Sequence, residues 1–394
     1  MNLLSFSPFS PKDTTGLRLA GFYAALFAVV GVHMPYWPIW LAGKGLSPTE
    51  IGYLVAAGIL IKVVANPLIG EVVDRRGKRR STMVALAAAT LICYILFAFA
   101  DGFWPLLGLS LLAGGAFSAM IPLGENLSML IAYAKKIEYG RVRLWGSVSF
   151  ILSALIMGKI LGWADTNVVL YGLWGGLALL LASCWGLPEH AEGHAAAAPR
   201  PFGRLLTSKL FWLFLLAATL ISSSHMTYYG FATLHWREAG ISSTVIGALW
   251  AEGVVAEIIL FLFAGPVVAR LGPTRLLVLG GVGAVVRWTL MAATTNVNVL
   301  ILLQPLHALT FGATHLAAMH FLARAIPVGL SARAQTLYSS IVAGVGPGLA
   351  VLGAGALYEH HHSGAFLAAG ASALVGLVVA GRVHKSWNEK PLPL

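Results

Sequence analysis

The stretch GLSPTEIGYL at residues 45–54 returns as GISSTVIGAL at residues 240–249. Positions 195 apart match through both copies, so that Gly45 pairs with Gly240 and Ser47 pairs with Ser242. An internal repeat that lies this far apart in the chain predicts two structurally related halves.

The repeat extends beyond these two stretches. At the same spacing GEVVDRRG (70–77) aligns with GPVVARLG (265–272), and a looser match pairs RVRLWGS (141–147) with RAQTLYS (333–339). Halves related in this way are typical of transporters that alternate between two access states, with the substrate held near mid-membrane.

The composition is that of a membrane protein. Of 394 residues, 58% are hydrophobic and only 10% are charged, and the mean hydropathy is +0.80. A soluble domain has about a quarter of its residues charged. Long unbroken apolar runs also exclude the short alternating segments of a membrane β-barrel.

Apolar runs of about 20 residues, the length of a membrane-spanning helix, occur along the whole chain. We predict twelve, at 17–41, 50–70, 82–100, 104–133, 144–163, 167–187, 210–234, 244–269, 275–293, 297–323, 334–358 and 364–383. The polar segment 188–209 separates them into six and six. We therefore expect an all-α membrane protein with an N-terminal half (1–187), a central cytoplasmic loop (188–209) and a C-terminal half (210–394).

The net charge is +11, and the basic residues are concentrated in alternate loops. On the predicted topology, 21 of the 26 Lys and Arg lie at the termini and in alternate connections, on one side of the membrane. Because cytoplasmic loops are enriched in Lys and Arg, we expect both termini in the cytoplasm, in a multi-pass protein of the inner (plasma) membrane. The basic residues thus face the lipid bilayer surface, and nucleic acid is not an expected partner.

The segment 70–79 resembles the loop between helices 2 and 3 of the major facilitator superfamily. The matching residues are Gly70, Asp74, Arg75, Gly77 and Arg79. In that superfamily the loop latches the two halves in one access state. The resemblance implies a gating role here, weaker in the second copy, which lacks the Asp.

Five charged residues lie inside predicted spans and away from their ends: Lys62, Glu125, Glu252, Glu257 and Arg287. Each costs roughly 3 kcal/mol at the bilayer centre, so each is a functional candidate. Lys62 and Glu257 are repeat mates, since they are 195 positions apart. A cation in one half and an anion at the corresponding position of the other would suit a polar site.

Glu252 and Glu257 are not equivalent. Five residues separate them, which is about 140° around a helix, so they face different directions and do not form a paired metal site. Trp250 and Glu257 share a face that we expect to border the cavity, and Glu252 is expected to contact another helix. The alternative for Glu257 is a structural ion pair with Arg287.

Polar and aromatic side chains form stripes in other spans. Tyr36, Tyr228, Gln304, His307 and His315 are the members that we take as site candidates. Polar stripes in spans usually line water or a ligand, whereas aromatic residues near span ends are more often interfacial anchors. Trp37, Trp40 and Trp236 are therefore expected in the interfacial belt.

Several stretches resemble the phenylpropionate permease group, whose relatives are nucleoside and lactose proton symporters. They include YGRVRLWGSVSF (139–150), LWAEGVVAEIILF (249–261), VVRWTLMAATT (285–295) and LHALTFGATHLAAMHF (306–321). The resemblance implies uptake of an aromatic monocarboxylate together with a proton.

These observations assign roles to the candidates. Substrate binding is expected at Lys62, Arg287, Tyr36, Tyr228, Trp250, Gln304 and His307, and proton coupling at Glu257, Glu125 and His315. A glutamate that shares its cation with an arriving anion could gain a proton as the substrate binds. We expect a monomer without a cofactor or metal.

Other readings remain open. The chain could carry a neutral nucleoside or sugar, could be an exporter, or could be a receptor or scaffold on a transporter fold. The sequence EHHHSG (359–364) is read as a solvated loop rather than a metal site. Since a phosphate-binding G-x-x-x-x-G-K loop is missing from the sequence, nucleotide-driven pumping is not supported, and no catalytic constellation indicates an enzyme.

Overall fold

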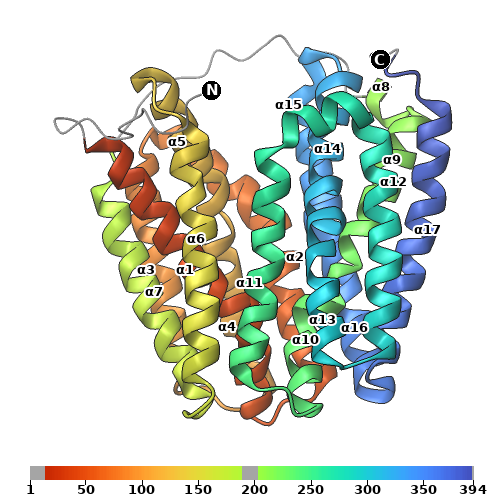
Figure 1. Ribbon diagram of the computed structural model, residues 1–394. Helices are drawn as coiled ribbons and strands as arrows, with labels where there is room; N and C mark the ends of the chain where they lie inside the picture. Colours follow the sequence, from red (N-terminus) through yellow and green to blue (C-terminus); the bar gives the residue numbers. More distant parts are fainter. Residues whose placement is uncertain (1–13, 189–202, 393–394) are drawn as a thin grey trace. The chain divides into compact units, whose positions relative to one another are not determined.

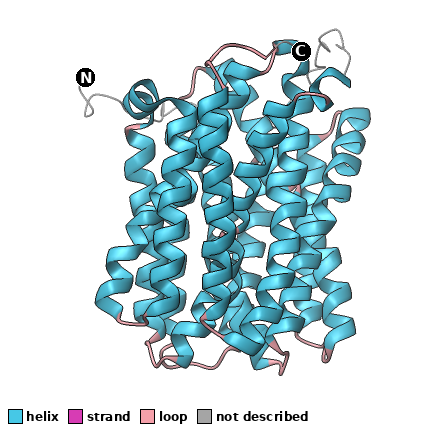
Figure 2. Ribbon diagram, turned by 90° about the vertical axis from the view of Figure 1, so that its right-hand side faces the viewer, coloured by secondary structure: helices cyan, strands magenta, loops and turns pink. Residues whose placement is uncertain are grey.

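The computed structural model describes residues 14–188 and 203–392, and within them every regular element is helical, with no strand (Figure 2). Twelve helical segments in this part of the chain are long and apolar enough to cross a membrane. The predicted all-α class and the predicted twelve spans are confirmed.

Two compact units can be distinguished. The first takes its described residues from Met1–Gly45 and Ile61–His194, and the second from Leu46–Leu60 and Ala195–Leu394. The first unit contains α1 (Thr15–Gly43), the later part of α2 (Pro48–Arg76), α3 (Arg79–Phe97), α4 (Phe103–Ser118), α5 (Met120–Lys135), α6 (Tyr139–Ile160) and α7 (Asn167–Gly186) (Figure 1). Within it, α1 packs mainly against α6 and α7.

The second unit is built largely around α12 and its neighbours α17 and α14. Its elements are α8 (Gly203–Leu206), α9 (Lys209–Ser223), α10 (His225–Glu238), α11 (Ser243–Leu262), α12 (Ala264–Ala293), α13 (Val297–Leu303), the 3₁₀-helix η1 (Gln304–Leu306), the π-helix η2 (Ala308–Ala313), α14 (Thr314–Ala325), α15 (Val328–Ser340), the π-helix η3 (Ile341–Val345), α16 (Gly346–His361) and α17 (Gly364–Ser386).

Several predicted spans are interrupted. The span 104–133 breaks at Ala119, and the span 210–234 breaks at Ser224. The span 244–269 was predicted too long, because α11 ends at Leu262 and a new helix starts at Ala264. Hydropathy does not report such breaks, since the residues on either side are equally apolar.

The repeat is visible in the backbone. Gly45 and Gly240 both have positive φ, +84° and +82°, in the turn before a helix. In each copy the following serine side chain accepts a hydrogen bond from a backbone N–H three residues later, Ser47 from Glu50 and Ser242 from Val245. Such capping supplies partners for the free N–H groups at a helix start.

The first part of α2 packs on α16 through two glycines. A Cβ on Gly52 would lie 3.2 Å from the Cα of Gly355. At the end of this contact, Glu359 Oε2 accepts a hydrogen bond of 3.0 Å from the backbone N–H of Thr49. Close backbone approach is thus the reason that residues 46–60 group with the second unit.

The prediction of an interfacial belt for three tryptophans was wrong. Trp37, Trp40 and Trp236 are 4%, 1% and 0% exposed. The rings of Trp37 and Trp40 stack at 4.7 Å with planes 11° apart, and Phe97 packs edge-on against both. Aromatic packing inside the unit has taken these side chains away from the lipid interface.

Candidate functional site

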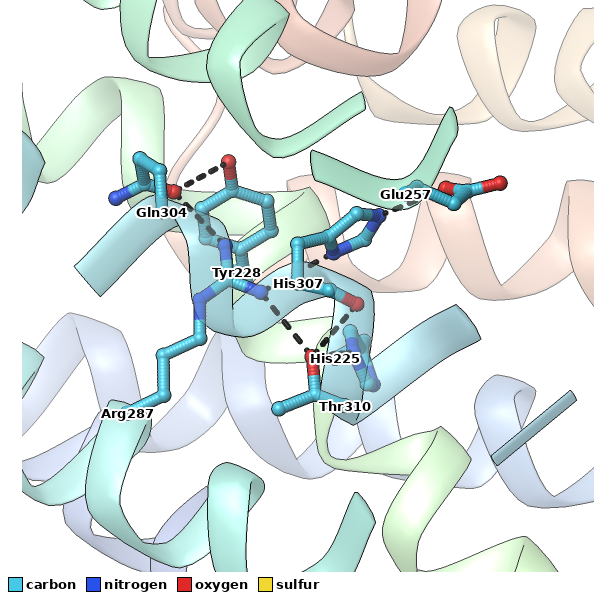
Figure 3. A network of polar contacts seen from close by, with 7 residues as sticks. All are labelled: His225, Tyr228, Glu257, Arg287, Gln304, His307 and Thr310. Carbon is cyan, nitrogen blue, oxygen red and sulfur yellow. Dashed lines mark hydrogen bonds and ion pairs between the residues drawn. The ribbon is translucent and has the colours of Figure 1, made fainter. Parts of the chain in front are cut away.

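Arg287 lies at the centre of a polar network in the second unit (Figure 3). It comes from α12 and is 0% exposed. Nη2 donates a hydrogen bond to Gln304 Oε1 at 2.8 Å, and Nη1 donates to His307 Nδ1 at 3.1 Å and to Thr310 Oγ1 at 3.3 Å. Three neutral acceptors from one helical segment therefore surround the guanidinium.

The positive charge of Arg287 is not neutralised directly. Among the described residues no carboxylate lies within ion-pair distance of it, and its Nε has no hydrogen-bond partner. The guanidinium carbon lies 4.6 Å from the ring centre of Tyr228 and 4.8 Å from that of Trp288, which gives it two aromatic faces. A buried cation in this state is suited to receive an anion.

His307 connects Arg287 with Glu257. Its Nδ1 faces Arg287, and its Nε2 lies 3.4 Å from Glu257 Oε2 (Figure 3). A guanidinium carries only donors, so Nδ1 must accept and the ring proton belongs on Nε2, where it points at the carboxylate. The side chains of His307 and Glu257 are 9% and 18% exposed. The ion pair that we considered between Glu257 and Arg287 is thus bridged by an imidazole.

A second histidine extends the network. His225 Nδ1 lies 3.2 Å from the carbonyl oxygen of Ser222, and its Nε2 lies 2.9 Å from Thr310 Oγ1. Because the carbonyl can only accept, the His225 proton belongs on Nδ1, and Nε2 accepts from the Thr310 hydroxyl. Thr310 in turn accepts from Arg287, and its hydroxyl also lies 3.5 Å from the carbonyl oxygen of His307, a longer contact than that to His225.

Non-α backbone positions these groups. Gln304 lies in η1, and Thr310 lies in η2, with His307 between them. Short 3₁₀- and π-segments within a helix redirect side chains and often occur at functional sites. Gly253 of α11 faces this segment, and a Cβ there would lie 3.3 Å from the Cβ of His307.

The structure brings most of the second-half candidates together. Arg287, Tyr228, Gln304, His307 and Glu257 belong to the network, and Tyr228 donates to Gln304 Oε1 at 3.3 Å. Trp250 is adjacent, with its ring centre 4.4 Å from that of Tyr228 and its Nε1 donating to Thr233 Oγ1.

Sequence reasoning missed Thr310 and left His225 out of the site. The available signal was spacing, because Gln304, His307 and Thr310 succeed one another every three residues. A threonine in an apolar span attracts little attention by itself, since its hydroxyl can be satisfied by its own helix backbone.

Two predicted substrate-binding residues belong to the first unit. The Tyr36 hydroxyl donates to the carbonyl oxygen of Ala154 at 2.7 Å, and its ring is fully buried, which favours a structural role. Lys62 is half-buried in α2 and forms no ion pair within the described residues. Its role in substrate binding stays a prediction.

Glu125 has a cationic partner that was not among the assigned site residues. Arg143 Nε lies 3.9 Å from Glu125 Oε1, and the two side chains are 29% and 42% exposed, respectively. The guanidinium carbon lies 4.0 Å from the ring centre of Phe27 and 5.4 Å from that of Tyr23. The first unit therefore has its own looser acid and base pair.

His315 follows the network residues further along the tenth span, in α14. It is exposed, and its ring is parallel to that of Phe311, with centres 6.1 Å apart. Its assignment to proton coupling stays a prediction.

The predicted gating loop lies at the junction of α2 and α3. Gly77 has φ +62° and its N–H bonds to the carbonyl oxygen of Val73, which closes the turn. Arg75 pairs with Glu71 one helical turn earlier, and Arg79 is buried. The side chain of Asp74 lies outside the described part of the structure. The gating role stays a prediction.

A groove of about 730 Å³ lies beside this loop. Its lining is mainly apolar and comes from α2 and α3: Leu68, Ile69, Val72, Lys78, Ser81, Thr82, Ala85 and Leu86. None of the intramembrane charges lines it. Within residues 14–188 and 203–392 no group of three or more His, Cys, Asp or Glu is placed to hold a metal ion.

The fold is that of a transporter. The crystal structure of the nucleoside transporter NupG superposes with a TM-score of 0.80 at 15% identity and covers 95% of this chain and 100% of that one. An inward-facing, occupied structure of a bacterial homologue of the human lysosomal transporter Spinster superposes with a TM-score of 0.75 at 13% identity. The match covers 97% of this chain and 100% of that one.

Sequence comparison gives the family. The model of the MFS_1 like family matches residues 16–368, and the chain belongs to this family. A probable 3-phenylpropionic acid transporter of Escherichia coli strain K12 is 33% identical over 371 residues, which are 92% of this chain and 97% of that protein. The maltose permease of Geobacillus stearothermophilus is 26% identical over 94% of this chain and 95% of its own.

These findings confirm the superfamily resemblance. The chain is a multi-pass inner-membrane secondary transporter of the major facilitator kind and not an enzyme.

Proposed function

We propose that the protein takes up a small aromatic carboxylate, such as 3-phenylpropionate, together with a proton by alternating access. The observation that carries the proposal is the buried Arg287, which has three neutral acceptors and, in the part of the chain that the structure describes, no carboxylate partner. A substrate carboxylate would replace a neutral acceptor with a charged one, and hydrogen bonds between ionised groups are the stronger kind.

The coupling step is assigned to His307. Its Nδ1 can accept from Arg287 or carry a proton, but not both. When a substrate carboxylate takes the Arg287 N–H, Nδ1 is released and can be protonated, and Glu257 beside Nε2 stabilises the resulting imidazolium. Binding of the anion and of the proton therefore favour each other, which is what symport requires.

The relatives support the substrate class. A protein 33% identical to this chain is named a probable 3-phenylpropionic acid transporter. On the same reasoning the chain would act as a monomer, with both termini in the cytoplasm, and Lys62, Glu125 and His315 would contribute to the substrate and proton pathways.

The test is uptake of radiolabelled 3-phenylpropionate into proteoliposomes under an imposed inward proton gradient. Accumulation that collapses on addition of a protonophore is expected. The Glu257→Gln variant should lose uphill uptake while it retains exchange of internal for external substrate, because Gln cannot stabilise the imidazolium. Glu252→Gln is the matched control, since it removes a carboxylate from the same helix outside the network, and it should keep uphill uptake.

Neutral substrates are the second candidate. A relative at 26% identity is named a maltose permease. If phenylpropionate is not accumulated but maltose or a nucleoside is, then Arg287 is a structural cation and the anion proposal is wrong. Uphill uptake by Glu257→Gln at the rate of the unmodified protein would refute the coupling step alone.

A further inference from the structure

Three aromatic rings follow one another along the tenth span. His307 and Phe311 have ring centres 5.4 Å apart with planes 5° apart, and Phe311 and His315 have centres 6.1 Å apart with planes 6° apart. The π-helix η2 holds more residues in a turn than an α-helix, so residues four apart come close to alignment. We call these three residues the ring ladder.

The middle ring of the ladder is exposed although its sequence neighbours are not. Phe311 is 40% exposed, whereas Thr310 is 0% exposed and Gly312 is buried. Many phenylalanines of a membrane protein face lipid, and lipid contact would by itself account for this value.

Charge argues against a lipid-facing position. The ladder begins at His307, which contacts Arg287 and Glu257, and it ends at the exposed His315. Gly312, next to Phe311, packs beside Glu257, because a Cβ there would lie 3.8 Å from the Glu257 Cγ. Ionisable side chains in spans face the protein interior or a water-filled cavity, so the exposed surface of Phe311 faces the same side.

We infer that Phe311 is the specificity-determining residue on which the aromatic ring of the substrate stacks while its carboxylate binds Arg287. The inference rests on the function proposed above. The imidazole of His307 contacts both Phe311 and the Arg287 guanidinium. A short saturated linker between ring and carboxylate lets one molecule reach both.

The ring ladder also provides a surface on which an aromatic ring can stack. Offset stacking of rings needs centres roughly 4.5–7 Å apart, and a ring that already lies parallel to two neighbouring imidazoles is fixed in orientation. His225 packs edge-on against Phe311 at 6.4 Å and restricts it further. A planar aromatic ring gains from such a platform, whereas a puckered ring of similar size does not.

The experiment compares 3-phenylpropionate with 3-cyclohexylpropionate, which has the same carboxylate and linker but a saturated ring. Uptake into proteoliposomes gives the ratio of kcat/KM for the two acids. In Phe311→Leu the ratio of phenyl to cyclohexyl acid should fall about fivefold, since aromatic stacking contributes about 1 kcal/mol. In Phe311→Tyr, which keeps an aromatic ring, the ratio should stay the same.

Phe263→Leu is the matched control. Phe263 is 59% exposed, lies just beyond the end of α11 and makes no ring contact with the ladder among the described residues, so its substitution should leave the ratio unchanged. Retained uptake of the cyclohexyl acid by Phe311→Leu shows that this variant is folded. An unchanged ratio in Phe311→Leu, or an equal fall in Phe263→Leu, overturns the inference alone. Failure of the unmodified protein to take up either acid overturns the proposed function, and this inference with it.

Discussion

The two units each hold a charged cluster, and the clusters differ in kind. In the first unit Glu125 and Arg143 face each other at 3.9 Å, with side chains 42% and 29% exposed. In the second unit Arg287 is fully buried, and its hydrogen-bond partners among the described residues are neutral acceptors, while Glu257 is one imidazole away.

The difference follows from solvation. A partly exposed ion pair gains little from its attraction, because water screens it and the side chains stay mobile. A buried cation without a counter-ion is costly, and its charge is felt strongly at low dielectric. The second cluster is therefore the one that we propose to bind the anion, and the first is able to adjust its geometry.

The largest expected effect tests this difference at Arg287. Arg287→Gln should lower kcat/KM for 3-phenylpropionate about 100-fold, because removal of a buried charged hydrogen bond costs about 3 kcal/mol. The kcat/KM of Arg287→Lys should lie between those of the unmodified protein and Arg287→Gln, since lysine keeps the charge but lacks the planar fork of donors. Uptake rates in proteoliposomes measure both.

Arg275→Gln serves as the control for this series. Arg275 lies on the same helix, α12, and is exposed, so its loss should change uptake little. If Arg287→Gln transports as well as Arg275→Gln, Arg287 does not bind the substrate.

A smaller effect is expected in the first unit. Arg143→Gln should reduce uptake about fivefold or less, because an exposed pair of this kind is worth about 1 kcal/mol at most. The same assay carried out with Glu125→Gln and with the double variant gives the coupling between the two residues. A loss as large as that of Arg287→Gln would place the anion site in the first unit and reverse the comparison.

The smallest effect concerns the repeat itself. Gly45 and Gly240 have φ values of +84° and +82°, and a Cβ on either would meet no atom within 4 Å. Ala at either position should therefore lower the free energy of unfolding by about 1 kcal/mol through backbone strain alone. The two variants should show equal decreases of Tm in detergent. Gly353→Ala, in a helix with open space, should not lower Tm. Unequal shifts would mean that the two turns are not structurally equivalent.

Part of the site was predictable from sequence. Arg287, His307, Gln304 and Glu257 were found because polar residues are rare in apolar spans and are kept there for a reason. The contact of Glu257 with His307 could not be read from the repeat pairing of Lys62 with Glu257. The contact of Thr310 with Arg287 became visible only once the helices were packed.

The sequence by itself determined the twelve spans and the internal repeat, because hydropathy and spacing act along the chain. Tertiary structure alone decided which charges meet, where the tryptophans lie and where the first part of α2 packs. Those outcomes depend on the rotation and depth of each helix against its neighbours. Close contacts such as that of Gly253 with His307 determine this rotation and depth, and they join residues that are distant in sequence.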